Sequence, residues 1–491
     1  MRRLSLFAFA VGLAVPLHAR AETLSVGPQG AYPAPCAAFA AASDGDTIEI
    51  DSAGNYAGDV CGITKSQLTI RGKGGLAKID ADGKNAQGKA IWVVQGADTL
   101  IENVEFSGAA VADLNGAGIR QEGKNLTVRG CYFHDNENGI LAGDSAGSEI
   151  LIENSEFEHN GAGDGYSHNL YINHIAKLTF RYNWSHRAVI GHLLKSRAAE
   201  NYVLYNRVTG EDGTSSYELD FPNGGKTYVI GNLIQQGEST DNPSMLAYIE
   251  EGAAATNPSH QLYVVNNTFV NARSSGTFLN IAAAADPAVL KNNLFVGAGT
   301  PVSQAGALLS NNHTDATPCL VDSATFDYHL APDSPCVNGG ADPGDGEGFA
   351  LAPNAHYLHP ASSSGRASVG TIDIGAYELG GDAEPGGGAG GSGGKGTTGN
   401  AGSSSNSAGQ SSGGNSSAGS SNAGGTQPSG NAGSSSPNGG TSTTDAKEDS
   451  GCGCRVTSTR QTSRAQAWAL VALLGLAARR SRQRRAKRYG Q

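Results

Sequence analysis

A short pattern recurs through the middle of this 491-residue chain. Each copy is a β-rich run ending in Asn or Gly, followed within three residues by an apolar or aromatic side chain. The copies end at Asn103, Gly130, Asn154, Asn183, Asn206, Asn232, Asn267 and Asn293, with successive spacings of 27, 24, 29, 23, 26, 35 and 26 residues. A fixed local pattern at variable spacing indicates coils of constant cross-section whose loops differ in length. Such short strands cannot bury their inner faces alone, so stacked coils must share one long core.

The pattern excludes other repeat architectures. A leucine-rich repeat has a similar period but needs a Leu-x-x-Leu-x-Leu signature and helical segments, and neither occurs. A β-propeller needs about 40 residues per blade. With 70 Gly in the chain, a coiled coil or a helical array is excluded as well. The Asn at each turn tolerates left-handed backbone and could stack on the Asn of the next coil.

Residues 22–378 resemble the right-handed parallel β-helix of the pectate lyase superfamily. The motifs Asp327–Leu330, Ser334–Cys336 and Asp373–Glu378 are similar to the closing coils of such proteins. The resemblance implies an all-β fold, a right-handed parallel β-helix (solenoid). It does not imply one activity, because this fold carries lyases, hydrolases, epimerases and non-catalytic adhesins.

The chain divides into four segments. Residues 1–21 carry an early Arg pair, an apolar run and a small-x-small site, as expected of a secretory signal. Residues 22–379 are the predicted β-helix domain. Within 381–440, 36 of 60 residues are Gly or Ser, so 380–450 is predicted to be a disordered Gly/Ser-rich linker. Residues 451–491 form a distinct C-terminal segment.

That C-terminal segment has three parts. Cys452 and Cys454 precede an apolar stretch from Ala465 to Ala478, and seven basic residues follow within 479–488. This stretch is short for a span of about 20 residues, so we expect a short hydrophobic helix held at a membrane by its basic flank. The order of Cys, hydrophobic and Arg elements resembles the sorting signal of myxobacterial surface proteins (MYXO-CTERM). The resemblance implies export, anchoring at the cell surface or outer membrane, and processing at Cys452 or Cys454 that could release the protein.

Charge is distributed unevenly along the chain. The whole sequence has a net charge of −11, but residues 22–379 have 19 basic and 40 acidic residues, a net charge of −21. So acidic a surface argues against nucleic acid as a partner. We expect a monomer whose partner is a polysaccharide.

The cysteines fit an exported protein. We expect disulfides between Cys319 and Cys336 across the last coils and between Cys36 and Cys61 near the first. Cys131 lies where neighbouring coils have apolar residues, so a buried core thiol is expected there rather than a reactive one.

Candidate functional groups gather in one region. Five of the 11 His residues of the domain lie within 159–192, and six of its 19 Lys and Arg residues lie within 177–207. The acidic and aromatic stretches Tyr217–Gly225 and Tyr248–Gly252 follow. A local basic region in an acidic body indicates a binding or catalytic site, although solvated or ion-paired surface residues, such as Lys195 with Glu218, would explain each residue singly.

The repeat predicts how these residues are arranged. Counting back 14 residues from three successive repeat Asn residues aligns Asn169, His192 and Glu218, with Leu170, Leu193 and Leu219 pointing inward. Strand alternation then predicts an outward polar ladder, with coils about 4.8 Å apart. We expect Asn169, Tyr171, His192, Glu218 and Asp220 on that ladder, and His168, Lys195, Arg197, Asn223, Tyr248 and Glu250 at or near it.

β-Elimination on an acidic glycan could use this ladder. The reaction needs a base for the C5 proton, a cation for the carboxylate and a donor for the leaving oxygen. Lys195 or His192 could be the base, Arg197 could neutralise the carboxylate, and Tyr217 or His168 could donate. The stretch Lys195-Ser-Arg…Asn206 resembles a segment of β-helix alginate and chondroitin lyases, which implies Lys195 as base. Those enzymes carry acidic calcium ligands just before the Lys, where this chain has Ala188, Ile190 and His192, which puts a bound calcium there in doubt.

Other functions stay open. Asp220 with Glu218 or Glu250 could form the carboxylate pair of a glycan hydrolase. A uronate epimerase would reuse the lyase groups, and a non-catalytic glycan-binding or adhesive protein would use the same groove. No cofactor is implied with certainty, although calcium could bind the acidic turns Asp80–Gly83 and Asp342–Glu347. The sequence has no zinc pattern.

Overall fold

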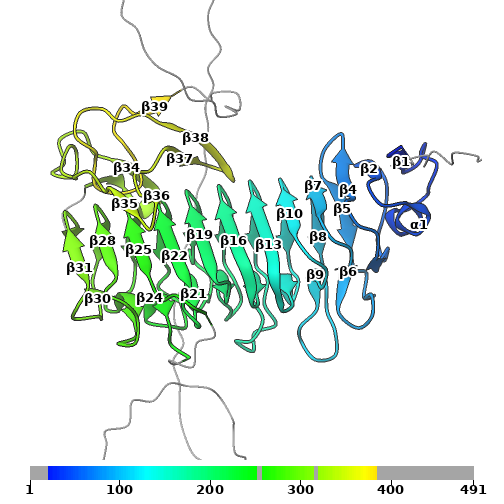
Figure 1. Cartoon of the computed structure of the whole chain (residues 1–491), viewed down its shortest axis with the longest axis horizontal. Helices are drawn as coiled ribbons and strands as arrows, with labels where there is room; N and C mark the ends of the chain where they lie inside the picture. Colours follow the sequence, from blue (N-terminus) through cyan, green and yellow to red (C-terminus); the bar gives the residue numbers. More distant parts are fainter. Residues whose placement is uncertain (1–19, 252–256, 315–318, 384–491) are drawn as a thin grey trace, which may run out of the picture. The chain divides into compact units, whose positions relative to one another are not determined.

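The structure, a computed structural model, describes residues 20–251, 257–314 and 319–383 (Figure 1). The first 19 residues of the predicted signal, the linker after residue 383 and the C-terminal segment with Cys452 and Cys454 lie outside the described residues. Within the described ranges, short strands stack coil on coil into a parallel β-helix. No helix of this part of the chain is both long and apolar enough to cross a membrane.

Each complete coil contributes one strand to each of three parallel sheets, here numbered I to III in the order the chain visits them. Sheet I has twelve strands: β1 (Thr23–Val26), β2 (Thr47–Asp51), β4 (Thr69–Lys73), β7 (Thr99–Glu102), β10 (Leu126–Arg129), β13 (Ser145–Glu153), β16 (Ile175–Arg181), β19 (Glu200–Leu204), β22 (Lys226–Ile230), β25 (Leu262–Val265), β28 (Val289–Lys291) and β31 (Leu308–Ser310).

Sheets II and III have ten strands each. Sheet II contains β5 (Ala77–Asp80), β8 (Val104–Ser107), β11 (Tyr132–His134), β14 (Glu156–Glu158), β17 (Trp184–His186), β20 (Arg207–Thr209), β23 (Leu233–Gln236), β26 (Thr268–Asn271), β29 (Leu294–Gly297) and β32 (His313–Thr314). Sheet III contains β3 (Cys61–Ile63), β6 (Ala90–Val94), β9 (Ala117–Gln121), β12 (Asn138–Ala142), β15 (Leu170–Ile172), β18 (Leu194–Ser196), β21 (Leu219–Phe221), β24 (Ser244–Tyr248), β27 (Thr277–Ile281) and β30 (Thr300–Val302).

Inside the β-helix, similar side chains from successive coils stack on one another. Phe106, Phe133 and Phe157 lie in one inward row of sheet II, with ring centroids 5.0 and 4.8 Å apart and nearly parallel planes. Inward side chains in one row meet at the strand spacing of about 4.8 Å, so each ring is covered by the next. The apolar residues of the repeat therefore build one continuous core.

At the turn between sheets I and II, left-handed backbone and side-chain stacking belong to two adjacent residues. The sequence pattern assigns both to one Asn. The left-handed residue is Asn103, Gly130 or Asn154 in three early coils, but Tyr182 and Tyr205 in the next two, one residue before the repeat Asn. The stacked residue is the following one. From Asn183 onward the stacked residue is Asn in each coil, and these residues form a ladder. The Oδ1 of each later Asn accepts a hydrogen bond from the backbone N–H of the Asn in the preceding coil; the accepting residues are Asn206, Asn232, Asn267, Asn293 and Asn312. The first three predicted repeat positions are therefore left-handed turn residues, whereas those from Asn183 onward are the stacked residues that follow such a turn.

Cys131 occupies the ladder position of its own coil. Its backbone N–H donates to Ser155 Oγ at 3.1 Å, and its thiol is buried. Burial raises the pKa of this thiol to about 12, so it stays protonated and unreactive at physiological pH.

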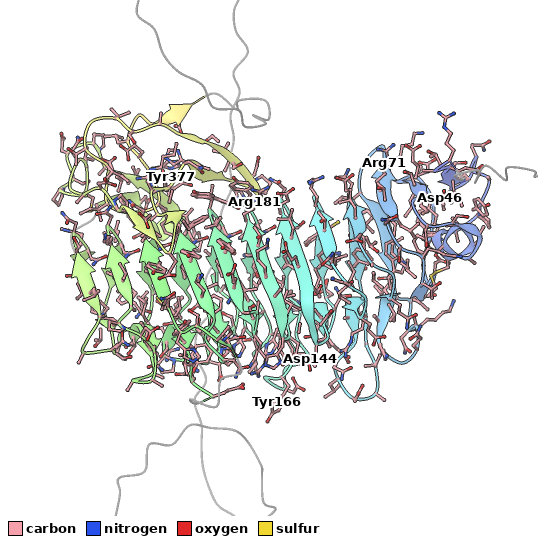
Figure 2. The ribbon with its side chains drawn as sticks, in the orientation of Figure 1. Asp46, Arg71, Asp144, Tyr166, Arg181 and Tyr377 are labelled. Atoms are coloured by element: carbon pink, nitrogen blue, oxygen red, sulfur yellow. A yellow bond between two sulfur atoms is a disulfide. The ribbon has the colours of Figure 1, made fainter. Side chains whose placement is uncertain are left out.

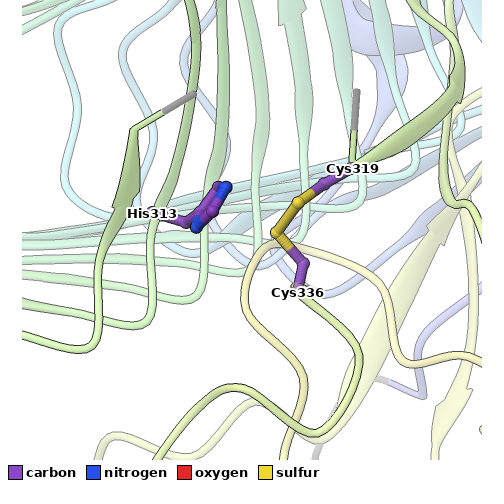
Figure 3. Close-up of side chains that lie close together, drawn as sticks. All are labelled: His313, Cys319 and Cys336. Atoms are coloured by element: carbon purple, nitrogen blue, oxygen red, sulfur yellow. A yellow bond between two sulfur atoms is a disulfide. The ribbon is translucent and has the colours of Figure 1, made fainter. Parts of the chain in front are cut away.

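Two disulfides fasten the ends of the described coils. The first joins Cys36 of α1 (Pro35–Ala41) to Cys61 of β3, beside the edge-on contact of Phe39 with Trp92 at 5.1 Å. The second joins Cys319 to Cys336, with His313 close by (Figure 3). Both are pairs that the sequence predicts.

Residues 319–383, the closing segment, fold back along two of the three sheets (Figure 1). On sheet I, the stacked Tyr202, Tyr228 and Tyr263 pack against Phe349. On sheet II, the outward Leu233 and Leu294 join a cluster with residues of the segment. This segment comprises β33 (Leu320–Asp322), the 3-10 helix η1 (Ser323–Thr325), β34 (Asp327–Leu330), β35 (Asp345–Gly346), β36 (Phe349–Ala350), β37 (Ala355–Leu358), β38 (Ser362–Arg366) and β39 (Asp382–Ala383).

Sheet III is not part of those clusters among the described residues. In Figure 2, Tyr377 marks the covered side, whereas Asp144 and Tyr166 lie on the opposite side, where the strands of sheet III run. The outer face of sheet III is therefore free of these clusters, whereas sheets I and II are each covered in part.

Candidate functional site

One outward residue from each coil lines up along the middle of sheet III. Parallel pairing places the following residues in this row: Val93, Arg120, Leu141, Tyr171, Lys195, Asp220, Ala247 and Asn280. Neighbours in such a row are about 4.8 Å apart. Tyr171 and Asp220 thus face outward, as the sequence predicts, and Lys195 lies between them.

Asn169 and Glu218 do not belong to this outward face, and here the sequence-based register is wrong. Both are fully buried. Asn169 Nδ2 donates to Phe157 O, and Gln236 Nε2 lies 3.4 Å from Glu218 Oε2, so both side chains point into the corner between sheets II and III. Leu194, and not Leu193, pairs with Leu219. The connection after Lys195 is one residue shorter than in the flanking coils, so counting back a constant number from each Asn slips by one.

His192 instead stacks with His168 and Tyr217 beside the ladder. The two imidazole centroids lie 4.5 Å apart and nearly parallel, and the centroid of the Tyr217 ring lies 5.1 Å from that of His192. His168 Nδ1 accepts from the backbone N–H of His192 at 3.0 Å, and His192 Nδ1 accepts from that of Tyr217 at 3.2 Å. These bonds assign the proton of each neutral ring to Nε2.

Burial keeps both rings neutral. It depresses the pKa of His168 and His192 well below the usual value, and the nearby Lys195 lowers both further. With Nε2 protonated, His192 can donate a hydrogen bond toward the ladder but cannot accept a proton there. His168 is 2% exposed and lies behind His192, so it positions that ring rather than reaching a substrate.

Lys195, Asp220 and His192 form the centre of the site. Lys195 Nζ lies 3.1 Å from Asp220 Oδ2, and His192 Nε2 lies 3.4 Å from the same oxygen. Burial raises the pKa of Asp220 to about 6, although the Lys195 ammonium opposes this shift. Asp220 is therefore ionised at neutral pH and protonated in mildly acidic solution.

Arg197 and Lys195 already hold a carboxylate, that of Glu251. Arg197 Nη1 and Nη2 donate to the two Glu251 oxygens at 2.6 and 2.7 Å, and Lys195 Nζ lies 3.6 Å from Glu251 Oε1. Arg197 Nε donates to Tyr171 Oη at 2.9 Å, and its Nη1 also donates to Asn223. The Glu251 side chain is 46% exposed, whereas those of Lys195 and Arg197 are 13% exposed. Arg197 and Lys195 thus form a carboxylate-binding site at the edge of the ladder.

Glu250 completes the site on the side of Tyr217. The Tyr217 hydroxyl and Asn280 Nδ2 both donate to Glu250. Burial and the Glu250 carboxylate both raise the pKa of Tyr217, so its hydroxyl remains a donor.

Tyr248 is not in the site, contrary to the sequence-based expectation. It is fully buried, and its hydroxyl donates to Gly225 O at 2.7 Å inside the coil. Because Glu218 is buried too, the predicted Glu218–Asp220 hydrolase pair and the Lys195–Glu218 ion pair are both wrong. Conversely, sequence reasoning omitted Glu251 and Asn280 from the predicted site. Glu251 stands beside the predicted Glu250, but no signal marked Asn280, which follows the longest interval of the repeat.

The residues that would replace the lyases' calcium ligands do not fit a calcium ion. Ala188 is fully buried and Ile190 is apolar, while His192 uses Nδ1 to accept a backbone hydrogen bond. The acidic turns use carboxylate oxygens internally: Asp80 accepts from the Asp82 N–H and the Ser107 hydroxyl, and Asp342 accepts from the Gly344 N–H.

The Asp220 carboxyl makes stability depend on pH. Its unfolded pKa is about 3.9, so between pH 4 and 6 the folded chain keeps a proton that the unfolded chain has lost, and stability falls as pH rises through that window. We expect the free energy of unfolding of the wild type to fall by about 3 kcal/mol relative to that of Asp220→Asn between pH 4 and 7. Urea denaturation at several pH values measures this, with the exposed Asp333→Asn as control. Parallel pH curves for the wild type and Asp220→Asn would contradict the raised pKa.

Comparison with known families supports the observed topology. A family model described as "Right handed beta helix region" matches residues 68–234. This region is a right-handed β-helix. The match contains β15, β18 and β21, which carry the centre of the site. No curated protein matches the chain.

Several solved structures resemble the β-helix at low identity. Pectate lyase Pel9A is 14% identical with a TM-score of 0.45, covering 73% of this chain and 96% of its own. An alginate lyase from Paenibacillus sp. str. FPU-7 is 15% identical with a TM-score of 0.34, covering 60% of this chain and 99% of its own. A pectin methylesterase from Aspergillus niger is 10% identical with a TM-score of 0.29, covering 64% and 90%. A shared fold of this kind does not carry an activity with it.

Proposed function

We propose that the outer face of sheet III binds an acidic polysaccharide and cleaves it by β-elimination. The observation that carries this proposal is the carboxylate of Glu251 seated between Arg197 and Lys195, beside the protonated Nε2 of His192. A uronate carboxylate has the same chemistry, and Glu251 is the most exposed member of the group. A substrate carboxylate would therefore take the place of Glu251 with few other changes.

The three groups required by elimination lie within this cluster. Arg197 neutralises the carboxylate, which acidifies the C5–H bond. Lys195 Nζ takes the C5 proton, the C4–O bond breaks, and the Tyr217 hydroxyl protonates the leaving oxygen, while His192 Nε2–H donates a hydrogen bond to the substrate.

We also propose that the protein is exported and displayed at the cell surface through its C-terminal segment. The signal-like N-terminus and the Cys–hydrophobic–Arg order support this proposal. The disulfides Cys36–Cys61 and Cys319–Cys336 are also typical of an oxidising compartment. At the surface, the site on sheet III would meet extracellular glycans.

The function is tested by incubating the full chain with a panel of polyuronates and other uronate-containing glycans. We expect ultraviolet absorbance from C4–C5 unsaturated products on at least one glycan, with the same rate after addition of a calcium chelator. New reducing ends without absorbance would indicate hydrolysis instead. Glycan binding without any product would favour the alternative, a non-catalytic adhesive protein, which the net charge of −21 of residues 22–379 also suits.

A further inference from the structure

A second group of ionisable side chains lies on the outer face of sheet II. Parallel pairing of β14 with β17 places Glu158 opposite His186 and Glu156 opposite Trp184. One ligand atom from each of Glu156, Glu158 and His186 lies within 4.8 Å of the others, and His186 Nε2 is 3.1 Å from Glu156 Oε1. This Glu–Glu–His cluster belongs to a different sheet from the proposed glycan site.

The imidazole of His186 is held as metal-binding histidines are held. It is 1% exposed, and the Trp184 ring stacks on it with centroids 3.7 Å apart and planes 2° apart. Its Nδ1 has no hydrogen-bond partner among the described residues, and the nearest carboxylate oxygen, Glu211 Oε2, lies 3.7 Å away. In metal sites the second histidine nitrogen donates to a carboxylate. Glu211 is the carboxylate placed to accept from His186 Nδ1, although the two atoms lie beyond hydrogen-bond distance here.

The two carboxylates retain the capacity to bind an ion. Among the described residues, the Glu156 side chain forms a hydrogen bond and an ion pair with His186 alone. Glu158 accepts from the Tyr132 hydroxyl at 2.6 Å and from Arg187 at 3.0 Å, which uses two of the roughly four lone-pair positions of a carboxylate. Such hydrogen bonds orient ligating carboxylates in metal sites.

The local charge also suits a cation. His186 belongs to a network of ion pairs with more carboxylates than guanidinium groups. The carboxylates are those of Glu156, Glu158, Glu211 and Asp212, and the guanidinium groups are those of Arg187 and Arg207. Burial lowers the pKa of His186, but the carboxylates of Glu156, Glu211 and Glu158 outweigh it and raise that pKa, so an ion would bind in exchange for the imidazole proton. Without that proton, the net charge of these groups is −2. A divalent ion would balance it.

We propose that Glu156, Glu158 and His186 bind a divalent transition-metal ion of the Mn²⁺ or Zn²⁺ type. One imidazole nitrogen with two carboxylate oxygens favours such ions over calcium, which prefers oxygen alone. Three protein ligands leave coordination positions for water. The ion would link two consecutive coils of sheet II, next to His359 of the closing segment, whose ring centroid lies 4.5 Å from that of Trp184.

Manganese is the suitable probe, because its preference for oxygen and nitrogen ligands avoids the thiols of Cys452 and Cys454. The free-ion EPR signal of Mn²⁺ is titrated with the full chain. We expect one ion per chain, quenching of Trp184 fluorescence and a higher unfolding temperature. Glu156→Gln should weaken binding at least tenfold, because it removes a direct ligand. This variant leaves the contacts of Glu158 and Arg187 intact, so the fold should be retained.

The matched control is Glu105→Gln, in the same outward row of sheet II two strands away. It should bind Mn²⁺ as the wild type does, and Lys195→Ala should too, since Lys195 lies on sheet III. Equal binding by the wild type and Glu156→Gln would overturn the proposal. So would a free Mn²⁺ signal that the wild type does not reduce.

Discussion

The Lys195→Ala variant is expected to form unsaturated product about 10²- to 10⁴-fold more slowly than the wild type, the usual contribution of a general base. Lys195 Nζ is the amine in contact with both the Asp220 carboxylate and the carboxylate held by Arg197. Its loss removes the proposed proton acceptor, whereas Arg197, which neutralises the uronate carboxylate, remains. Initial rates of absorbance increase on the glycan found active in the panel measure the effect.

The matched control is Lys226→Ala. Lys226 is paired with Glu200 at 3.8 Å on sheet I, away from the ladder, so its removal should leave the rate unchanged. Thermal unfolding of both variants separates loss of activity from loss of fold. If Lys195→Ala keeps more than a tenth of the wild-type rate on a cleaved glycan, Lys195 is not the base, and the roles in the proposed mechanism must be reassigned.

The Asn232→Ala variant is expected to be less stable than the wild type by about 4 kcal/mol, the upper range for a point substitution. Asn232 Oδ1 accepts from the backbone N–H of Asn206 at 2.8 Å and from its Nδ2 at 2.9 Å. Asn232 Nδ2 donates to Val203 O and to Asn267 Oδ1. All of these groups are buried, so alanine leaves several polar atoms without partners.

Urea denaturation of Asn232→Ala measures this loss as a lower midpoint. The exposed Asn354→Ala serves as control and should stay within about 0.5 kcal/mol of the wild type. A loss below about 1 kcal/mol for Asn232→Ala would mean that the ladder is not a principal source of stability. It would then act mainly by specifying which residues of successive coils meet.

The fold could be read from the sequence because its repeat is local. Each coil needs a turn residue that adopts left-handed backbone and inward side chains that match the next coil, so the pattern survives loops of any length. The 35-residue interval between Asn232 and Asn267 interrupts the spacing but not the stacking, since Val229 still pairs with Val264. The disulfide pairs could be predicted for the same reason, because the two cysteines of each pair lie in neighbouring coils or end segments.

The register of a single coil could not be read in the same way. A connection one residue shorter after Lys195 shifts His192 from the predicted row of Asn169 and Glu218 into a row with His168 and Tyr217. A one-residue change exchanges inward and outward side chains in a strand. Asn169 and Glu218 are buried for another reason: each lies one residue before its strand begins, at the corner between sheets II and III, where the alternation of strand side chains does not hold.

The sequence by itself determined the stacked coils, the positions of the strands and the concentration of Lys195, Arg197 and Asp220 in one region, because these depend on neighbours in the chain and on a repeating pattern. Only the tertiary structure decided the partners of each side chain. Glu251 reaches Arg197 from 54 residues away, and the closing segment packs on parts of sheets I and II but not on the outer face of sheet III. Such contacts depend on loop paths and burial, which no local spacing encodes, and they set which groups are neutral, charged or accessible.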